Sequence, residues 1–366
     1  ATTYGVSASP RDVVMRVTIL GAGEDEQYDS LLTSDPHTLM YASSAYRDVL
    51  DHFLVARPRY LIARKGGEMQ AALPCFLSAP GTYGAVLNSL PFYGSNGGVV
   101  PASAPPEARA ALLNAFFELA HEQQCAAATI IVSPFDESVS AYEERIQPDF
   151  VDMRIGQLTP LPQNRTDRED LLLRSFHGKT RNLVRKGGKN DFQVRRQATV
   201  ETFEFLEATH MQSMRALGRQ AKPSAFFRAV RKRLTEGKEF GVYTAFHQDE
   251  PVAALLLLYF NRTVEYFLPV VKKEFRAAQP LSLLIFRAMV DAAGRGYAWW
   301  NWGGTWPNQD SLYHFKNRWG TQDKNYYYYV KLWRPELRTL SKDDLLSMYP
   351  YFFTIPFDGL GYREDL

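Results

Sequence analysis

The sequence FGVYTAFHQDEPVAALLLLYF, at residues 240–260, decides the expected fold. An apolar run, a polar His-Gln-Asp-Glu turn at residues 247–250 and a longer apolar run follow one another, the pattern of a β-hairpin. About 180 residues earlier, residues 59–77 (RYLIARKGGEMQAALPCFL) have the same pattern around Gly66-Gly67. Two hairpins of one kind indicate an internal repeat.

The elements expected after each hairpin also come in the same order. In the first copy, residues 85–100 predict a further strand, followed by a helix with apolar residues at positions 108, 112, 115, 116 and 119 and a strand at 126–132. In the second copy, the strand is at 264–271, the helix has apolar residues at 281, 284, 285, 288, 289 and 292, and the last strand is at 297–302. Both helices have the spacing of a helix packed on a sheet. We therefore predict an α/β fold of two tandem units, each a mixed central β-sheet flanked by helices.

The length of 366 residues is sufficient for two domains. We expect a first unit at residues 15–159, a proline-containing linker at 160–170, a second unit at 171–333, and a C-terminal tail at 334–366 that packs back on the body. The cleft between the two units is the expected active site.

The composition excludes several classes of protein. Hydrophobic residues make up 45% and charged residues 22% of the chain, so a disordered or fibrous protein is excluded. No run approaches about 18 apolar residues, so no transmembrane segment is expected. Cys75 and Cys125 lie in apolar runs, which favours buried thiols and a cytoplasmic location. The net charge of +2 gives no general attraction to nucleic acid, and no DNA partner is expected.

Residues 299–305 (WWNWGGT) and 311–320 (SLYHFKNRWG) place Lys316 shortly after a glycine bend that closes an apolar strand. Glycine permits close approach of a ligand, and a lysine beside such a bend can stabilise developing negative charge, as acyl transfer requires. The alternative interpretation is a solvated lysine on an amphipathic helix. His314 or Asp310 is a candidate proton acceptor through water, with a structural role as the alternative for either residue.

Two other segments are candidate substrate contacts. Residues 174–189 (RSFHGKTRNLVRKGGK) predict a basic helix, in which Arg181 and Lys179 are candidates for binding phosphate or carboxylate. A solvated helix face is the alternative. Residues 89–99 (SLPFYGSNGGV) predict a glycine-rich loop in which Tyr93 and Asn96 offer hydrogen-bond donors, unless the loop is an ordinary surface connection.

Several known motifs are absent from the sequence. The stretch VTILGAG at residues 17–23 lacks the third glycine of a dinucleotide fingerprint, because Glu26 occupies that position. The seven histidines and two cysteines show no metal-ligand spacing, so no metal site is expected. No nucleophile elbow or Walker loop occurs, so neither covalent catalysis nor a tightly bound cofactor is expected.

Five motifs, in this order, resemble the FemAB-like branch of the GNAT acyltransferase superfamily over roughly residues 40–332. They are LPFY at 90–93 with Gly97-Gly98, KTRNLVRK at 179–186, MRALG at 214–218, Gly296-Tyr297 with NWGGT at 301–305, and Phe315-Lys316 with Trp319-Gly320. The resemblance implies a tandem GNAT-fold enzyme that attaches an acyl or aminoacyl group to an amine, in cell-envelope or polysaccharide biosynthesis.

The resemblance also implies roles for particular residues. Lys316, in the Phe315-Lys316 motif, would stabilise the tetrahedral intermediate, and Arg181 would lie near the phosphates of the acceptor. The catalytic candidates are Lys316, Phe315 and His314. The candidates for substrate binding are Arg181, Lys179, Tyr93, Asn96, Gly303, Gly304, Thr305 and Tyr266.

The acyl donor stays open. The usual Arg/Gln-x-x-Gly-x-Gly/Ala loop, whose amides hold the pyrophosphate of CoA, corresponds to residues 276–282 (RAAQPLS), where both glycines are replaced. A long coiled-coil insertion for tRNA is also missing. Acyl-CoA and aminoacyl-tRNA are both possible cosubstrates, with an amino sugar, sugar nucleotide, glycan or cell-envelope peptide precursor as acceptor. The alternative function is a noncatalytic tandem protein that binds an anionic glycan or RNA.

Overall fold

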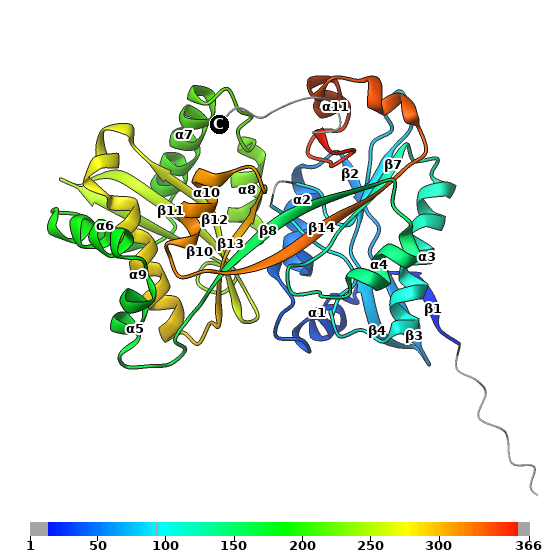
Figure 1. Cartoon of the computed structure of the whole chain (residues 1–366), viewed down its shortest axis with the longest axis horizontal. Coiled ribbons are helices and arrows are strands. Elements are labelled where there is room, and N and C mark those ends of the chain that lie inside the picture. Colours follow the sequence, from blue (N-terminus) through cyan, green and yellow to red (C-terminus); the bar gives the residue numbers. More distant parts are fainter. Residues whose placement is uncertain (1–13, 93, 358–366) are drawn as a thin grey trace, which may run out of the picture.

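The computed structural model describes residues 14–92 and 94–357, which form two α/β halves side by side (Figure 1). The elements of the first half, in chain order, are β1 (Arg16–Ile19), α1 (Asp25–Thr33), the 3₁₀ helix η1 (Met40–Ala42), α2 (Ser44–Phe53), β2 (Ala56–Pro58), β3 (Leu61–Lys65), β4 (Glu68–Leu73), β5 (Phe76–Ser78), β6 (Val86–Asn88), α3 (Pro106–Glu122), β7 (Ala127–Ile131), α4 (Val139–Ile146) and β8 (Phe150–Pro160). The elements of the second half are α5 (Arg168–Ser175), α6 (Gly178–Lys189), β9 (Gln193–Arg196), α7 (Val200–Ala216), α8 (Ser224–Arg233), β10 (Phe240–His247), β11 (Glu250–Phe260), β12 (Thr263–Val271), η2 (Lys273–Ala278), α9 (Pro280–Gly294), β13 (Trp299–Thr305), α10 (Asp310–Asn317) and β14 (Gln322–Leu332). The chain continues into η3 (Pro335–Thr339) and α11 (Lys342–Met348).

Within the described residues, the strands form one eleven-stranded sheet, in the order β2-β5-β6-β7-β14-β8-β13-β12-β11-β10-β9, and one three-stranded sheet, β1-β3-β4. Each half contributes one parallel pair to the large sheet: β6 pairs with β7, and β12 pairs with β13. Helix α3 or α9 connects the two strands of each pair, because parallel strands need a crossover connection. The predicted α/β fold with an internal repeat is therefore confirmed.

The last strand of each half pairs with strands of the other half. Strand β8 follows β7 in the chain but lies between β14 and β13, whereas β14 follows β13 but lies between β7 and β8. Figure 1 shows both strands running from one half into the other. The two central sheets expected from the repeat are thus joined into one continuous sheet. Because β8 and β14 cross between the halves, no single position in the chain divides this sheet into two.

Two predicted elements differ from the structure in the first half. The hairpin at residues 59–77 forms β3 and β4 of the small sheet, and after Pro74, which has no N–H to donate to a ladder, the chain enters the large sheet as β5. The strand expected at residues 85–100 is only the short β6. Beyond it, residues 89–92 and 94–99 form a loop, in which the Ser89 amide bonds the Thr129 carbonyl oxygen at 2.9 Å.

The basic segment at residues 174–189 is two helices rather than one. Helix α5 ends at Ser175, and α6 starts at Gly178. The Phe176 side chain packs edge-on against Trp319, with ring centroids 5.0 Å apart, and the imidazole Nδ1 of His177 accepts a hydrogen bond from the Lys179 amide at 3.1 Å. Packing of Phe176 and capping by His177 therefore break the helix.

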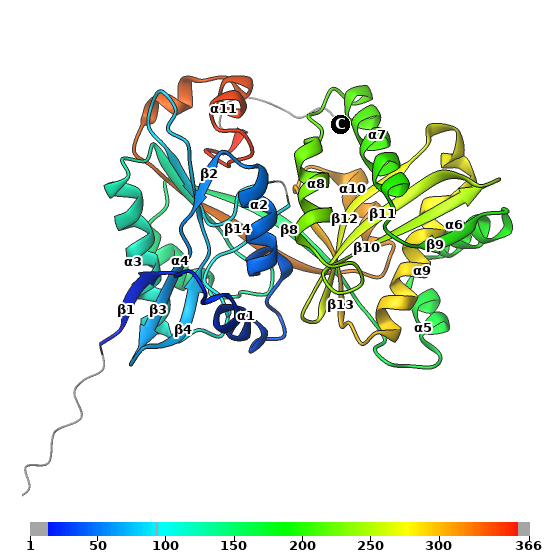
Figure 2. The same ribbon diagram turned by 180° about the vertical axis from the view of Figure 1, so that it is seen from behind.

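An apolar core lies between the two halves. Figure 2 shows α2 of the first half beside α8 of the second, and the rings of Phe53 and Phe226 from these helices are 6.0 Å apart. Residues of both halves belong to the same buried cluster. Separate clusters lie under α3 and α9, and Cys75 and Cys125 are buried free thiols. Among the described helices, none combines the length and the apolar character needed to cross a bilayer.

The segment after β14 packs against the first half. Tyr349 donates a hydrogen bond from its hydroxyl to the Gly84 carbonyl oxygen at 2.9 Å, and its side chain is fully buried. Asn88 bonds both backbone groups of Phe353, donating from Nδ2 at 2.8 Å and accepting at Oδ1 at 2.7 Å. These bonds hold residues 349–353 beside β6.

Candidate active site

The parallel strands of each half stop pairing partway along, and within the described residues a loop bonded beyond the last pair is seen in the first half. In the first half, β6 and β7 pair up to Asn88 and Thr129, and beyond this pair lies the loop of residues 89–92 and 94–99, where the Gly97 amide bonds the Ile131 carbonyl oxygen at 2.7 Å. In the second half, β12 and β13 pair only as far as Glu265 and Asn301. The candidate site is the gap beyond this last pair.

Lys316 approaches this gap from helix α10. Its side chain is buried, with 5% of the residue exposed, and its ammonium donates hydrogen bonds to the Gly304 carbonyl oxygen at 3.1 Å and to Thr305 Oγ1 at 2.9 Å. The Thr305 hydroxyl in turn donates to Gln157 Oε1 at 2.8 Å. Burial lowers the pKa of Lys316 to about 8. Within the described residues these two bonds use two of the three N–H donors of the ammonium, which leaves one for a substrate.

Aromatic side chains surround Lys316 on its face of the sheet. The rings of Tyr266 and Trp302 are 4.7 Å apart, and Trp302 lies 6.1 Å from Phe315 and 5.5 Å from Trp319. The indole N–H of Trp302 donates to Thr159 Oγ1 at 2.9 Å, so this buried polar group is satisfied. Burial raises the pKa of the Tyr266 hydroxyl. The aromatic wall excludes water and strengthens electrostatic interactions of the ammonium.

Glu265, which the sequence analysis did not single out, lies where the strands diverge. Only 1% of the residue is exposed, and its Oε2 accepts hydrogen bonds from the Tyr41 hydroxyl at 3.1 Å and from Asn301 Nδ2 at 2.8 Å. Its Oε1 has no hydrogen-bond partner within the described part of the chain. Burial raises the pKa of Glu265 to about 8. Asn301 Oδ1 also accepts a hydrogen bond from the Gly303 amide at 2.9 Å, so Glu265 and Asn301 together hold the glycine bend in place.

A cavity of about 1000 Å³ lies between the halves, on the other face of the sheet. Side chains along β8 point alternately to the two faces of the sheet, so Arg154 and Gln157, three residues apart, lie on opposite faces. Arg154 lines the cavity, whereas Gln157 donates to the Tyr313 carbonyl oxygen of α10 at 3.1 Å. The cavity reaches Gly304, whose carbonyl oxygen accepts a hydrogen bond from the Lys316 ammonium. Gly304 of the glycine bend thus borders the cavity and also bonds the Lys316 ammonium.

The structure brings together most of the residues predicted at the glycine bend. The residues gathered around this gap are Lys316, Phe315, Gly303, Gly304, Thr305 and Tyr266. Gly304 has to be glycine here, because a Cβ would overlap the Tyr326 hydroxyl. His314, two residues before Lys316, is exposed to solvent.

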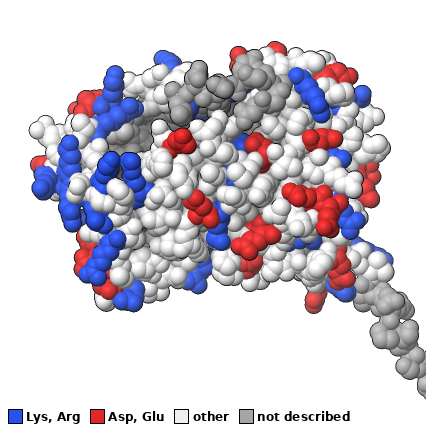
Figure 3. Space-filling model, in the orientation of Figure 1, with Lys and Arg blue, Asp and Glu red and all other residues white. Residues whose placement is uncertain are grey.

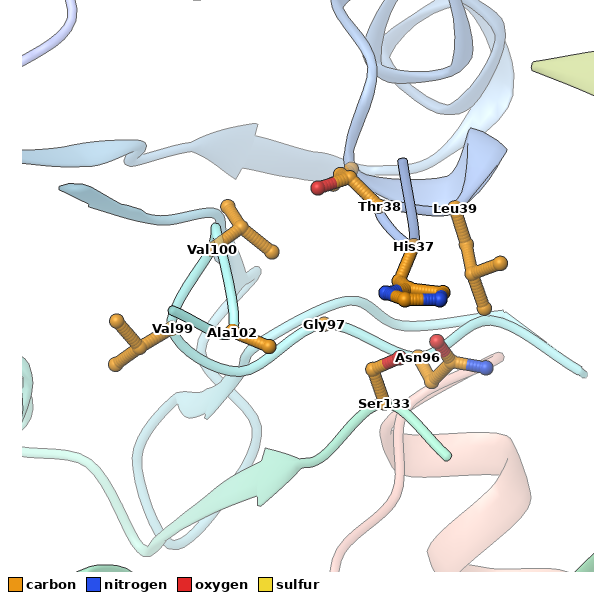
Figure 4. Close-up of a pocket in the computed structure, with 10 residues that line it drawn as sticks. His37, Thr38, Leu39, Asn96, Gly97, Val99, Val100, Ala102 and Ser133 are labelled. Carbon is orange, nitrogen blue, oxygen red and sulfur yellow. The ribbon is translucent and has the colours of Figure 1, made fainter. Parts of the chain in front are cut away.

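Other predicted residues lie elsewhere. Asn96 lines a separate cavity of about 10 Å³ with His37 and Ser133 (Figure 4), which has room for about one water molecule and none for a substrate. Tyr93 is outside the described residues.

The two basic candidates start helix α6. Arg181 donates to the Phe176 carbonyl oxygen at 2.6 Å, and Phe176 packs on Trp319 next to the aromatic wall. Lys179 is exposed. Figure 3 shows Lys and Arg side chains gathered over the end of the molecule that contains α6.

Comparison with known proteins agrees with this architecture. Residues 174–317 match the family described as an acetyltransferase (GNAT) domain. No curated protein matches the chain.

Three solved structures are similar over most of the chain. The structure of FemX is 16% identical and covers 88% of this chain and 99% of its own, with a TM-score of 0.68. The C-terminal domain of a putative lysylphosphatidylglycerol synthetase from Agrobacterium fabrum is 11% identical. It covers 91% of this chain and 99% of its own, with a TM-score of 0.56. A tandem GNAT protein from the clavulanic acid biosynthesis pathway is 13% identical. It covers 87% of this chain and 98% of its own, with a TM-score of 0.53. Residues 174–317 thus match a GNAT domain family, and the whole chain has the fold of FemX and of the tandem GNAT protein, as its motifs predicted.

Proposed function

We propose that this protein is an N-acyltransferase that moves an acyl or aminoacyl group to the amine of an anionic acceptor. The acceptor classes proposed are amino sugars, sugar nucleotides, glycans and cell-envelope peptide precursors. The observation that carries the proposal is the buried ammonium of Lys316, held at the Gly303-Gly304 bend just beyond the last residue pair of β12 and β13.

The chemistry needs an oxyanion stabiliser but no protein nucleophile. The amine nitrogen attacks the carbonyl carbon of a thioester or ester, and the electron pair of the C=O π bond moves to its oxygen. The tetrahedral intermediate then collapses, releases the thiolate or the ribose oxygen, and loses the proton of the amine. The remaining N–H of Lys316 would donate to the oxyanion. With a pKa of about 8, Lys316 stays mostly protonated at neutral pH.

The residues around Lys316 would hold the bend and the carbonyl in place. Glu265 acts through Asn301, which binds the Gly303 amide, so we assign Glu265 a positioning role. Phe315 closes the aromatic wall against Trp302. His314 would accept the amine proton through solvent, because its side chain is exposed.

The donor is proposed to be acyl-CoA or aminoacyl-tRNA, both of which carry several phosphates. Arg181 and Lys179 open α6 on the same face of the sheet as α9 and α10, where they would bind phosphates. The buried free thiols of Cys75 and Cys125 support a reducing, cytoplasmic setting for the reaction.

The proposal is tested by incubating the purified protein with acetyl-CoA or a charged tRNA pool and a set of candidate amines, and measuring product masses. We expect Lys316→Met to reduce transfer by about 10² to 10³, the effect of losing one oxyanion donor. The matched control is Lys238→Met, because the Lys238 side chain is 78% exposed. Near-normal transfer by a folded Lys316→Met variant would contradict the proposal. Tight anion binding without any transfer would favour the noncatalytic alternative.

A further inference from the structure

The large cavity carries information about the substrate. Its volume of about 1000 Å³ is at the upper end for small-molecule sites and far exceeds what an acetyl group needs. One end of the cavity is formed by Gly304 and Trp306 of the second half, beside the Lys316 ammonium. The rest extends between the loop before α3, the end of α7 and the segment after β14. A reactant bound here would reach the reacting centre with one end only.

The wall of the cavity is mainly apolar. Aliphatic groups come from Leu90, Met214 and Leu346. The aromatic residues of the wall are Phe92, Trp306, Tyr326, Tyr328, Tyr351, Phe352, Phe353 and Phe357. Such a wall favours a ligand with a large apolar surface.

Several polar side chains of the wall are already engaged with protein groups. Asn88 uses its amide oxygen and nitrogen for the backbone of Phe353, and the hydroxyl of Ser95 shares a hydrogen bond of 2.8 Å with Tyr46. Arg154 pairs with Asp152 at 2.6 Å. A sugar needs many directional hydrogen bonds to its hydroxyl groups, and these side chains are poorly placed to supply them.

The charged residues in the wall have an excess of positive charge. Arg219, Lys222 and Lys342 line the cavity with Asp343 as the acidic lining residue, whereas the charge of Arg154, which also lines it, is balanced by the ion pair with Asp152. The ammonium of Lys222 lies over the ring of Phe92, 4.7 Å from its centroid. This potential would attract an anionic group on the ligand.

We propose that the cavity binds the acceptor, and that the acceptor is an amphipathic amine with an apolar, ring-containing body and an anionic group, rather than a hydroxyl-rich amino sugar. This inference rests on the proposed acyl transfer. The phosphate-rich donor is assigned to the face with Arg181, so Arg181 would contact the donor and not, as the family resemblance implied, the acceptor. The two reactants then approach Gly304 from opposite faces of the sheet.

Binding is tested first, because it does not depend on the chemical step. The probe is the dye anilinonaphthalene sulfonate, which has an aromatic body and one negative charge. Tryptophan and glucosamine phosphate serve as competitors, since both are amines that carry an anionic group and only tryptophan has an apolar ring system. We expect tryptophan to displace the dye and glucosamine phosphate to leave it bound. The reverse order of displacement would overturn the inference.

Two substitutions place the dye in the cavity. Leu346→Trp adds volume to the wall and is expected to weaken dye binding at least about tenfold, whereas Leu183→Trp, on α6 outside the cavity, leaves binding unchanged. Lys222→Met is expected to weaken binding, with Lys238→Met as the control. Circular dichroism confirms that each variant is folded. Equal dye binding by Leu346→Trp and the parent protein would overturn the inference.

A transfer assay separates this inference from the proposed function. With a productive donor, kcat/KM for tryptophan is expected to exceed that for glucosamine phosphate by about tenfold or more, a difference of about 1.4 kcal/mol. Transfer that prefers the amino sugar would refute the inference and keep the acyltransferase function. Dye displacement by tryptophan without transfer from either donor would refute the function and keep the apolar site.

Discussion

Replacing Glu265 by Gln is expected to change how the stability of the protein depends on pH. The buried carboxyl has its pKa raised from 4.5 to about 8, so the folded protein holds a proton that the unfolded chain has released between these pH values. The free energy of unfolding therefore falls as pH rises from about 4.5 to about 8. At about 1.4 kcal/mol per pH unit, the full effect is about 5 kcal/mol.

The amide introduced by Glu265→Gln would keep the hydrogen bonds from Tyr41 and Asn301 but could not ionise. Chemical unfolding of both proteins at about pH 5 and about pH 8 measures the difference in the free energy of unfolding. We expect the variant to gain about 3 to 4 kcal/mol relative to the parent protein between these two conditions. All other titrating groups are present in both proteins, so their contributions cancel in the difference between the two free energies of unfolding.

Glu250→Gln is the matched control, because the Glu250 side chain is 78% exposed, and its pH profile should parallel that of the parent protein. Parallel profiles for Glu265→Gln as well would refute the reasoning that burial keeps this carboxyl protonated.

Three further substitutions and one pH profile test the site and its support. Gly187→Ala should lower the free energy of unfolding by about 1 to 3 kcal/mol, because its Cβ would lie 2.5 Å from the carbonyl oxygen that precedes α9. A Cβ at Gly188 would have no atom within 4 Å, so Gly188→Ala should raise the free energy of unfolding by about 0.5 to 1 kcal/mol. Equal effects of Gly187→Ala and Gly188→Ala in chemical unfolding would contradict the packing of α6. Gly304→Ala should reduce transfer by about 10²-fold, because the new Cβ overlaps the Tyr326 hydroxyl and displaces the bend; a steady-state assay with unchanged kcat would argue against it. The value of kcat should fall as pH rises above about 8, where Lys316 loses its proton, and a profile that stays flat to about pH 10 would exclude this role.

Local pattern was enough to predict several elements of the second half. The hairpin of β10 and β11 and the buried stripe of α9 follow from apolar spacing alone, because periodicity matches the geometry of a strand or helix. The same reasoning missed the break between α5 and α6, since that break depends on Phe176 packing against Trp319, which is distant in sequence.

The candidate site could be predicted only in part. Lys316 and the glycine bend are close in sequence, so their proximity was predictable. Glu265 was not singled out, because its importance comes from Tyr41, which lies 224 residues earlier, and from burial between the halves. Its one signal in the sequence is a carboxylate in the apolar run of β12.

The sequence by itself determined that this protein is a repeated α/β chain with a lysine after a glycine bend, because hydrophobic period and turn residues act over a few neighbouring positions. Only the tertiary structure decided that β8 and β14 exchange between the halves, that β12 and β13 stop pairing after Glu265 and Asn301, and that a loop is bonded to β7 beyond its last pair with β6. It also decided that Lys316 is buried. Strand order and burial depend on contacts between residues far apart in the chain, and no local pattern specifies them.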